Sequence, residues 1–245
     1  MATLTRWLPL LFLGWAALAR AGVRIESTVS AYVGQPVDTV LELQGDSFRV
    51  ERRDANDQLP HSTIFDGQRM LILNGKDKSY NEMSLDDLKA QMAKLEEIKD
   101  RLPPEARAQL DKQEALPAYT FKRTSGGEKV AGIRCENYQI LKNGEDAGTA
   151  CLASWKGSSL VTKADLAPMK KLVESMKSLS KLSSGDLAMG QFEQWPGWPL
   201  VMRAPDGHDL SRVKKIARET FPASEFKPPA DYTKKSLPQM GMGHP

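Results

Sequence analysis

Two residue types that carry much enzyme chemistry are scarce in this sequence. Its 245 residues include three histidines and two cysteines, and no two histidines have the spacing of metal ligands. The sequence also shows no acid/base pair and no nucleophile elbow. We therefore expect a protein that is not an enzyme and needs no cofactor. A hydrolase whose site is assembled from residues distant in the sequence stays open as an alternative.

Long apolar runs and an excess of one charge are lacking as well. After the N-terminus no segment is long and apolar enough to cross a membrane, so no transmembrane anchor is expected in the mature chain. Lys and Arg number 34 against 31 Asp and Glu. This near balance gives no support to nucleic-acid binding.

The N-terminus has the features of a cleavable signal peptide. Arg6 precedes an apolar stretch over residues 7–18, which is followed by Ala19-Arg20-Ala21. Small residues at both positions read by signal peptidase predict cleavage before Gly22, so residues 1–21 form the signal. The sequence thus predicts a periplasmic or secreted protein. An uncleaved N-terminal membrane anchor is the alternative.

The two cysteines are predicted to form a disulfide. Residues 134–141 and 149–155 have the composition of strands, and Asn143-Gly144 between them is a strong hairpin signal. Such a hairpin places Cys135 and Cys151 nearly opposite each other, at a separation that suits a disulfide. An even cysteine count in an exported chain favours the same conclusion. Two buried free thiols or a metal pair remain alternatives.

The first part of the mature chain has the pattern of consecutive β-hairpins. Short alternating runs are separated by two-residue turns that contain glycine. Further strands are expected after the helices described next, with Ser125-Gly126-Gly127 as a turn between two of them. The predicted strands are 24–31, 37–43, 47–53, 63–65, 68–73, 78–83, 118–124, 129–133, 134–141, 149–155, 198–203 and 211–220.

Two longer segments have helical periodicity. Ser84 is an expected N-cap, and an apolar face follows at Leu85, Leu88, Met92, Leu95, Ile98 and Leu102. A shorter helix is expected over 105–113. Asp165 is expected to cap a further helix with Leu166, Met169, Leu172, Val173, Met176, Leu179 and Leu182 on its apolar face.

This order of elements predicts an α+β fold. We expect a curved antiparallel β-sheet, a half-barrel, with two or three amphipathic helices packed on its concave face. Residues 22–235 are expected to form one domain. The chain is rich in Pro, Gly and Met from Pro228 onward and is expected to be loose there, with residues 236–245 as a flexible tail.

Several segments taken together resemble a known family. They are 46–51 (DSFRVE), 65–73 (FDGQRMLIL), 78–83 (KSYNEM), 128–138 (EKVAGIRCENY) and 222–232 (PASEFKPPADY). The set resembles DUF4412, a family of exported bacterial domains of unknown function. The family is similar in fold to the periplasmic lipoprotein-carrier proteins, whose half-open barrel holds acyl chains. The resemblance implies a fold and supplies no catalytic residue.

The apolar faces of the helices suggest a ligand site. Methionines adapt to irregular ligands, and an aromatic stretch could form the rim of a groove. We expect a lipid, an acyl chain or an apolar peptide to bind between sheet and helices. The expected lining residues are Leu88, Met92, Leu95, Leu172, Met176, Trp195 and Trp198. Ordinary core packing of the methionines, a core-capping role for the tryptophans, and an envelope-assembly factor with a filled core are the alternatives.

The C-terminal tail offers a weak metal candidate. Met240, Met242 and His244 carry thioether and imidazole groups, which suit Cu(I). Three donors on a flexible tail bind weakly unless something closes over them. A plain flexible tail without metal is the alternative.

Overall fold

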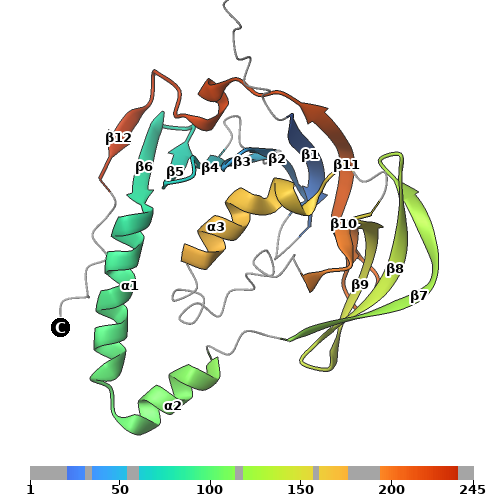
Figure 1. The fold of residues 1–245 in the computed structure, drawn as a ribbon, viewed down its shortest axis with the longest axis horizontal. Coiled ribbons are helices and arrows are strands. Elements are labelled where there is room, and N and C mark those ends of the chain that lie inside the picture. Colours follow the sequence, from blue (N-terminus) through green and yellow to red (C-terminus); the bar gives the residue numbers. More distant parts are fainter. Residues whose placement is uncertain are drawn as a thin grey trace, which may run out of the picture.

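The computed structural model describes residues 21–30, 35–53, 61–113, 118–156, 160–175 and 194–236. These residues are mostly β and form one open, curved sheet (Figure 1). Its strands are β1 Gly22–Val29, β2 Val37–Gln44, β3 Ser47–Arg53, β4 His61–Phe65, β5 Arg69–Asn74, β6 Ser79–Ser84, β7 Tyr119–Val130, β8 Ile133–Lys142, β9 Glu145–Ser154, β10 Gly197–Arg203, β11 Asp209–Glu219 and β12 Thr233–Lys235. Their spatial order is β12-β6-β5-β4-β3-β2-β1-β11-β10-β9-β8-β7.

The predicted succession of hairpins in the first part of the chain is confirmed. Strands β1 to β6 pair each with the next in antiparallel register. Tight turns allow this arrangement, and Gly45, between β2 and β3, has the positive φ of 58° that favours glycine. Strand β1 also pairs with β11, which joins the two parts of the sheet.

The expectation of an entirely antiparallel sheet is wrong at one edge. Strand β12 pairs parallel to β6, with Thr233 opposite Ser79, so the sheet is mixed. The stretch from Pro228 is therefore not loose up to residue 235, since it ends as the last strand of the sheet. Its backbone covers the otherwise free edge of β6, where unpaired N–H and C=O groups would be exposed.

The expected turn at Ser125-Gly126-Gly127 is a bulge within one continuous strand. The register between β7 and β8 shifts between Arg123 and Gly127. A Cβ on Gly127 would lie 2.3 Å from the carbonyl oxygen of Cys135, so the close approach of the two strands requires glycine there. The hairpin turn lies at Ala131-Gly132, where both residues have positive φ. Because alanine seldom adopts that conformation, the sequence pattern did not reveal this turn.

The disulfide between Cys135 and Cys151 is present, as the sequence predicted. The two Cα atoms are 5.3 Å apart, and both side chains are buried. Cys151 lies opposite Asn137, so the cysteines are diagonal neighbours on β8 and β9. The bridge therefore joins two strands inside the main hydrophobic cluster.

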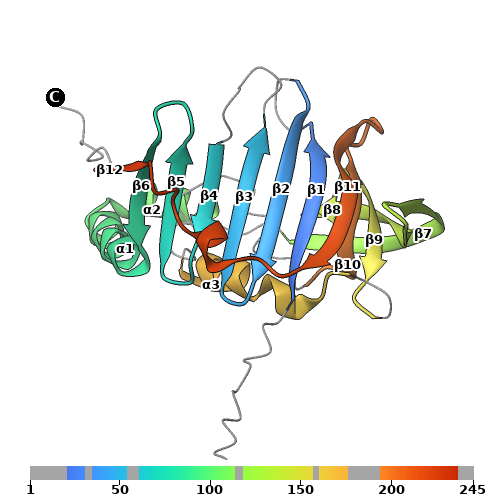
Figure 2. The ribbon, with the colours of Figure 1, turned by 90° about the horizontal axis from the view of Figure 1, so that it is seen from above.

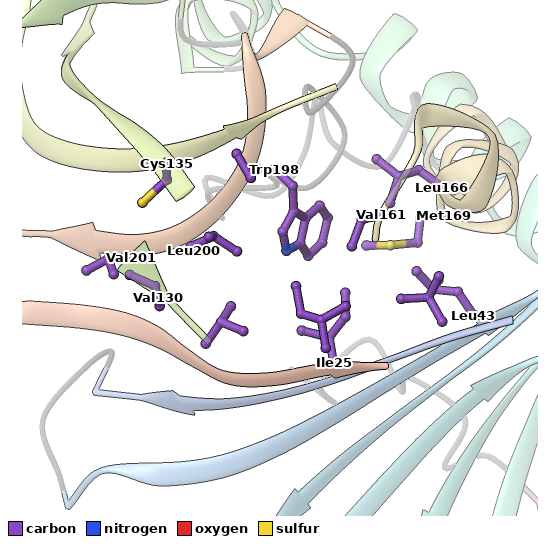
Figure 3. Packing of buried hydrophobic residues seen from close by; sticks show 14 of the residues in the cluster. Ile25, Leu43, Val130, Cys135, Val161, Leu166, Met169, Trp198, Leu200 and Val201 are labelled. Atoms are coloured by element: carbon purple, nitrogen blue, oxygen red, sulfur yellow. The ribbon is translucent and has the colours of Figure 1, made fainter. Parts of the chain in front are cut away.

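The β7–β9 end of the sheet rolls toward β10 and β11. Val130 at the end of β7 joins the same buried cluster as Leu200 and Val201 of β10 (Figure 3). A ring of ion pairs also joins these strands: Arg203 contacts Glu128 at 2.6 Å and Asp209 at 3.1 Å, and Arg212 contacts Asp209 at 2.6 Å and Glu128 at 3.6 Å. Glu128 is thus held by two arginines far from it in sequence.

Among the described residues, three α-helices and two short 3₁₀ helices accompany the sheet. They are α1 Leu85–Asp100, α2 Pro104–Gln113, η1 Lys163–Leu166, α3 Ala167–Ser175 and η3 Ala223–Phe226. Helix α1 begins at the end of β6, where Ser84 is the N-cap as expected and forms a capping box with Asp87. Figure 1 shows α1 and α2 running away from the sheet edge, whereas α3 lies inside the curve. The expected packing of two or three helices on the concave face therefore does not hold for α2 or for most of α1.

The start of α3 differs from the expectation that Asp165 caps it. Asp165 lies within η1, and its carboxylate accepts a hydrogen bond from the backbone N–H of Thr162 at 2.7 Å. The cap position is thus three residues earlier than expected. The same carboxylate pairs with Arg218 of β11 at 2.7 Å, which fixes the helix against the sheet.

Candidate functional site

The two faces of β4, β5 and β6 carry different sets of side chains. Cross-strand register places Ile64 opposite Leu71 on one face and Phe65 opposite Met70 on the other. Phe65 belongs to the main cluster with Met169 of α3, so its face is concave. Ile64 belongs to a separate cluster with Phe221 and lies on the convex face.

The convex face is sealed by the C-terminal strap, which we define as residues 220–235. Figure 2 shows this segment crossing the sheet on the side away from α3. The rings of Phe221 and Phe226 pack edge to face, 6.0 Å apart. Both are buried against side chains of β4, β5 and β6, which are Ile64, Leu71, Leu73 and Tyr80. The apolar residues on this face are therefore covered by the chain itself.

Polar contacts fix the strap along its length. The side chain of Gln44 donates to the carbonyl of Phe221 at 3.0 Å and accepts from its N–H at 2.8 Å. Arg49 pairs with Glu225 at 2.9 Å, and Lys78 pairs with Asp231 at 2.8 Å. The strap is thus held at its start, middle and end.

A row of apolar side chains on the concave face is left open, and we call Met70, Ile72 and Met83 the apolar strip. Met70 lies opposite Met83, and Ile72 is the next residue of β5 on the same face. Ile72 is 46% exposed, and the two methionines are half-buried. The strip continues from Phe65, whose ring packs 5.5 Å from Phe48 inside the core. It is thus an outward extension of the hydrophobic core.

A buried carboxylate lies on the convex face of β2. Glu42 is almost fully buried, and its Oε1 accepts a hydrogen bond from Nη1 of Arg24 at 2.7 Å. Burial raises the pKa of Glu42 to about 7, and the nearby Glu225 adds to the increase, while Arg24 and Arg49 oppose it. Burial outweighs the attraction of Arg24, which also contacts Glu26 at 3.2 Å and is partly exposed.

The structure places Trp198 in the main cluster and Leu172 against it, and it also buries Leu88. Leu88 in the first turns of α1 is only 3% exposed. Leu172 of α3 is half-buried and packs against the main cluster. Trp198 is 6% exposed, and its ring lies between the sheet side chains and Met169 in Figure 3. These positions are core positions, and ligand contact by them remains a prediction.

The two predicted tryptophans do not lie in the same cluster. Trp198 packs in the main cluster, where its ring is 6.5 Å from that of Trp155. Trp195 is 2% exposed and packs in another cluster, 4.9 Å from the ring of Phe121. The structure therefore does not bring Trp195 and Trp198 together as one rim.

The remaining predicted residues are not characterised by the structure. Met92 and Leu95 lie on α1, but their side chains are outside the described set. Met176 lies outside the described residues, as do the copper candidates Met240, Met242 and His244. The signal segment over residues 1–20 is outside them as well.

Sequence reasoning missed the apolar strip, although a signal for it exists. Strand β5 reads Arg-Met-Leu-Ile-Leu-Asn, with four consecutive apolar residues instead of alternation. Such a run is typical of a strand with apolar contacts on both faces. Leu71 and Leu73 meet the strap, and the other two, Met70 and Ile72, form the strip.

Within the described ranges, no cluster of three or more His, Cys, Asp or Glu side chains could hold a metal ion. None of the helices described is long and apolar enough to span a membrane. The described part of the chain has several surface hollows, and the two larger of those identified lie away from the apolar strip. One of about 670 Å³ lies between the strap and the β4–β5 turn, beside Phe226 and Arg69. The other, of about 710 Å³, lies at the β7–β8 turn, beside Ile133 and Leu160.

Two of the solved structures that match this chain have TM-scores below 0.5 and low sequence identity to it. One is the crystal structure of an uncharacterized conserved protein from Thermus thermophilus, with a TM-score of 0.45 at 9% identity, covering 90% of this chain and 92% of that chain. Another is the crystal structure of MucB, with a TM-score of 0.37 at 12% identity, covering 87% of this chain and 59% of that chain. No curated protein matches this sequence.

A family model covers most of the chain. It is described as a domain of unknown function, DUF4412, and it matches residues 25–232. The matched range begins within β1 and ends within the C-terminal strap, before β12, and it includes the apolar strip, the buried Glu42 and both cysteines. The resemblance predicted from the strand and turn segments is confirmed, and this chain belongs to the DUF4412 family.

Proposed function

We propose that this protein binds a flexible apolar ligand, such as a lipid acyl chain, on the apolar strip of the concave face. The proposal retains the ligand class expected from the sequence and changes the residues that contact it. Met70, Ile72 and Met83 replace the buried Leu88 and Trp198 as the contact surface, because only partly exposed side chains can touch a ligand without repacking the core.

The observation that carries the proposal is the contrast between the two faces of the same strands. On the convex face the protein covers Leu71 and Leu73 with two phenylalanines of its own strap. On the concave face Ile72, between them in sequence, stays 46% exposed. Exposed apolar groups that continue a hydrophobic core are a common feature of ligand and partner sites.

The residue types suit an acyl chain. Methionine side chains are unbranched and adjust to an irregular or mobile ligand. Each methylene group removed from water contributes about 0.8 kcal/mol. A ligand with several methylenes along the strip therefore gains enough to bind without a specific polar contact.

The proposal includes the compartment and the absence of catalysis. An N-terminal signal sequence and a disulfide are both features of exported proteins. A ligand carrier needs no catalytic group. We therefore propose a non-enzymatic, periplasmic or secreted binding protein.

The test compares two isoleucines of nearly equal exposure. Ile72 on the strip is 46% exposed, and Ile98 near the end of α1 is 47% exposed. Binding of the neutral fluorescent probe N-phenylnaphthylamine is measured for the Ile72→Glu and Ile98→Glu variants. We expect Ile72→Glu to abolish binding of the probe, because it places a charged carboxylate against the apolar ligand. Ile98→Glu should leave probe binding unchanged. Equal binding by both variants and the parent protein would reject the strip as the site.

Native mass spectrometry of protein purified gently from the exported fraction identifies the natural ligand by its mass. A reproducible lipid adduct, lost in the Ile72→Glu variant, is the expected result. A clean unliganded mass together with specific co-purification of an envelope protein would favour the interaction factor over the carrier. The intact mass also tests the predicted cleavage before Gly22.

A further inference from the structure

The two faces of strands β1 to β6 differ in charge. The convex face carries several ion pairs, which are Arg24–Glu42, Arg49–Glu51, Arg53–Glu51 and Arg69–Glu82. Side chains alternate between the faces along each strand, and the register places every Asp and Glu side chain of these six strands on the convex face: Glu26, Asp38, Glu42, Glu51 and Glu82. Among the described residues, the concave face of β1 to β6 therefore has no carboxylate.

One arginine of these strands lies on the concave face. Phe48 of β3 belongs to the main cluster, and Arg52 follows it by an even number of residues, so both side chains are on the concave face. His61 of β4 is directly opposite Arg52 and, by the same alternation, shares a face with Phe65. Both Arg52 and His61 are exposed. A positive charge with an imidazole beside it thus lies on the face that has no carboxylate from β1 to β6.

The acidic groups nearest to this face along the chain are engaged or distant. Asp77 in the β5–β6 turn pairs with Lys235 at 2.5 Å and accepts a hydrogen bond from the Ser79 hydroxyl at 2.5 Å. Helix α3 crosses the opposite end of the strands, beside the β2–β3 turn (Figure 2), so its Glu174 is far from Arg52. Within the part of the chain that the structure describes, no carboxylate forms an ion pair with Arg52.

Arg52 and His61 lie beyond the Ile72 end of the apolar strip. His61 and Ile72 are diagonal neighbours on β4 and β5, a relation in which residues are about 7–8 Å apart. Along the strands, the distance from the level of His61 to that of Met70 is about 14 Å at the usual rise per residue. An extended alkyl chain bound along the strip therefore has one end beside Arg52 and His61.

We propose that the ligand of the apolar strip is an anionic amphiphile, whose acid group binds Arg52 with His61 as a second donor. Its chain runs along Ile72 toward Met70 and Met83. This inference rests on the proposed function of the strip and adds the polar group of the ligand. The guanidinium fork of arginine suits a carboxylate or a phosphate. A few polar groups beside an apolar surface are the usual means by which a site orients its ligand.

The binding test compares three ligands of equal chain length that differ in the polar group. Dodecanoate carries a carboxylate, dodecyl phosphate a phosphate, and dodecanol an uncharged hydroxyl group. Displacement of N-phenylnaphthylamine from the full mature protein, at concentrations too low for micelles, gives the three affinities. We expect both acids to bind more tightly than dodecanol, and the tighter acid identifies the preferred group. Equal affinities for all three ligands would overturn the proposal.

Arg52→Gln and Arg53→Gln form a matched pair of variants. The two arginines are adjacent on β3 and both are exposed, but their side chains lie on opposite faces, and Arg53 pairs with Glu51 at 2.6 Å. Loss of a charge-assisted hydrogen bond in Arg52→Gln should weaken binding of both acids about tenfold and leave dodecanol binding unchanged. Arg53→Gln makes the same change in net charge and should bind all three ligands like the parent protein. Equal weakening in both variants would assign the effect to net charge and reject the contact.

Binding of N-phenylnaphthylamine separates this inference from the proposal on which it rests. Because the probe has no acid group, Arg52→Gln should bind it like the parent protein, which also shows that the variant is folded. Normal probe binding together with unchanged acid affinity in Arg52→Gln would reject the acid-group contact alone. A parent protein that does not bind the probe would reject the strip as the site, and this inference with it.

Discussion

Reduction of the Cys135–Cys151 bridge is the perturbation whose size follows most directly from the structure. Both sulfur atoms are buried in the main cluster. Breaking the S–S bond with a reductant leaves two thiols of nearly the same volume in place. The change therefore removes the cross-link with little change in packing, unlike substitution by a smaller residue.

The loop length sets the expected magnitude. The cysteines are 16 residues apart in sequence. In the chain-entropy account, a bridge that closes a loop of this length lowers the entropy of the unfolded chain enough to stabilise the folded state by about 3 kcal/mol. The Cys151→Ser variant should lose about 2–4 kcal/mol, since it also buries a hydroxyl group.

Urea unfolding of the oxidised and reduced protein, followed by tryptophan fluorescence, measures this difference. The reduced protein should unfold at a lower urea concentration, and its m-value should increase because the unfolded chain is less compact. Thiol titration of protein unfolded without reductant accompanies the assay and should detect no free thiol.

Two results would refute the reasoning. Two free thiols in the protein from the exported fraction would show that the bridge does not form there. A stability difference well below 1 kcal/mol, with the bridge shown to be intact, would mean that β8 and β9 already restrict the unfolded chain as strongly as the cross-link does.

Two other perturbations have predictable effects on stability. Because burial raises the pKa of Glu42 to about 7 from an ordinary 4.5, the folded protein retains a proton that the unfolded chain releases, so stability should fall by about 1–3 kcal/mol as pH rises from 4.5 to 7. Glu42→Gln should flatten this dependence in urea titrations at several pH values, and an unchanged slope would assign it to other groups. Phe226→Ala should lower stability by about 3 kcal/mol, because the buried ring holds the strap against Ile64 and Leu71. Urea unfolding checks this loss, and a cost under 1 kcal/mol would show that the strap contributes little.

Local patterns predicted the local elements well. Alternation and glycine turns located the hairpins of β1 to β6, because side-chain period and turn conformation are properties of a few adjacent residues. Ser84 was recognisable as an N-cap because its partner Asp87 is only three residues away. The pairing of Cys135 with Cys151 was predictable as well, because both cysteines lie in a single local hairpin.

Features that depend on distant segments were not predictable in the same way. The four apolar residues of β5 indicate contacts on both faces, but nothing in that run shows which face the strap covers. The strap lies about 150 residues after β5 and β6 in the sequence, and its last segment, β12, pairs with the edge of β6. A Pro-rich composition suggested a loose segment, whereas tertiary hydrogen bonds and buried phenylalanines hold it in place.

The sequence by itself determined the family, the hairpins, the helix starting after Ser84 and the pairing of the two cysteines, since each depends on neighbouring residues or on a characteristic set of segments. Only the tertiary structure decided that Ile72 stays exposed while Leu71 is sealed, and that Arg52 lies on the concave face, where the described residues of β1 to β6 place no carboxylate. The physical reason is that exposure and charge compensation depend on which distant segments pack against a strand.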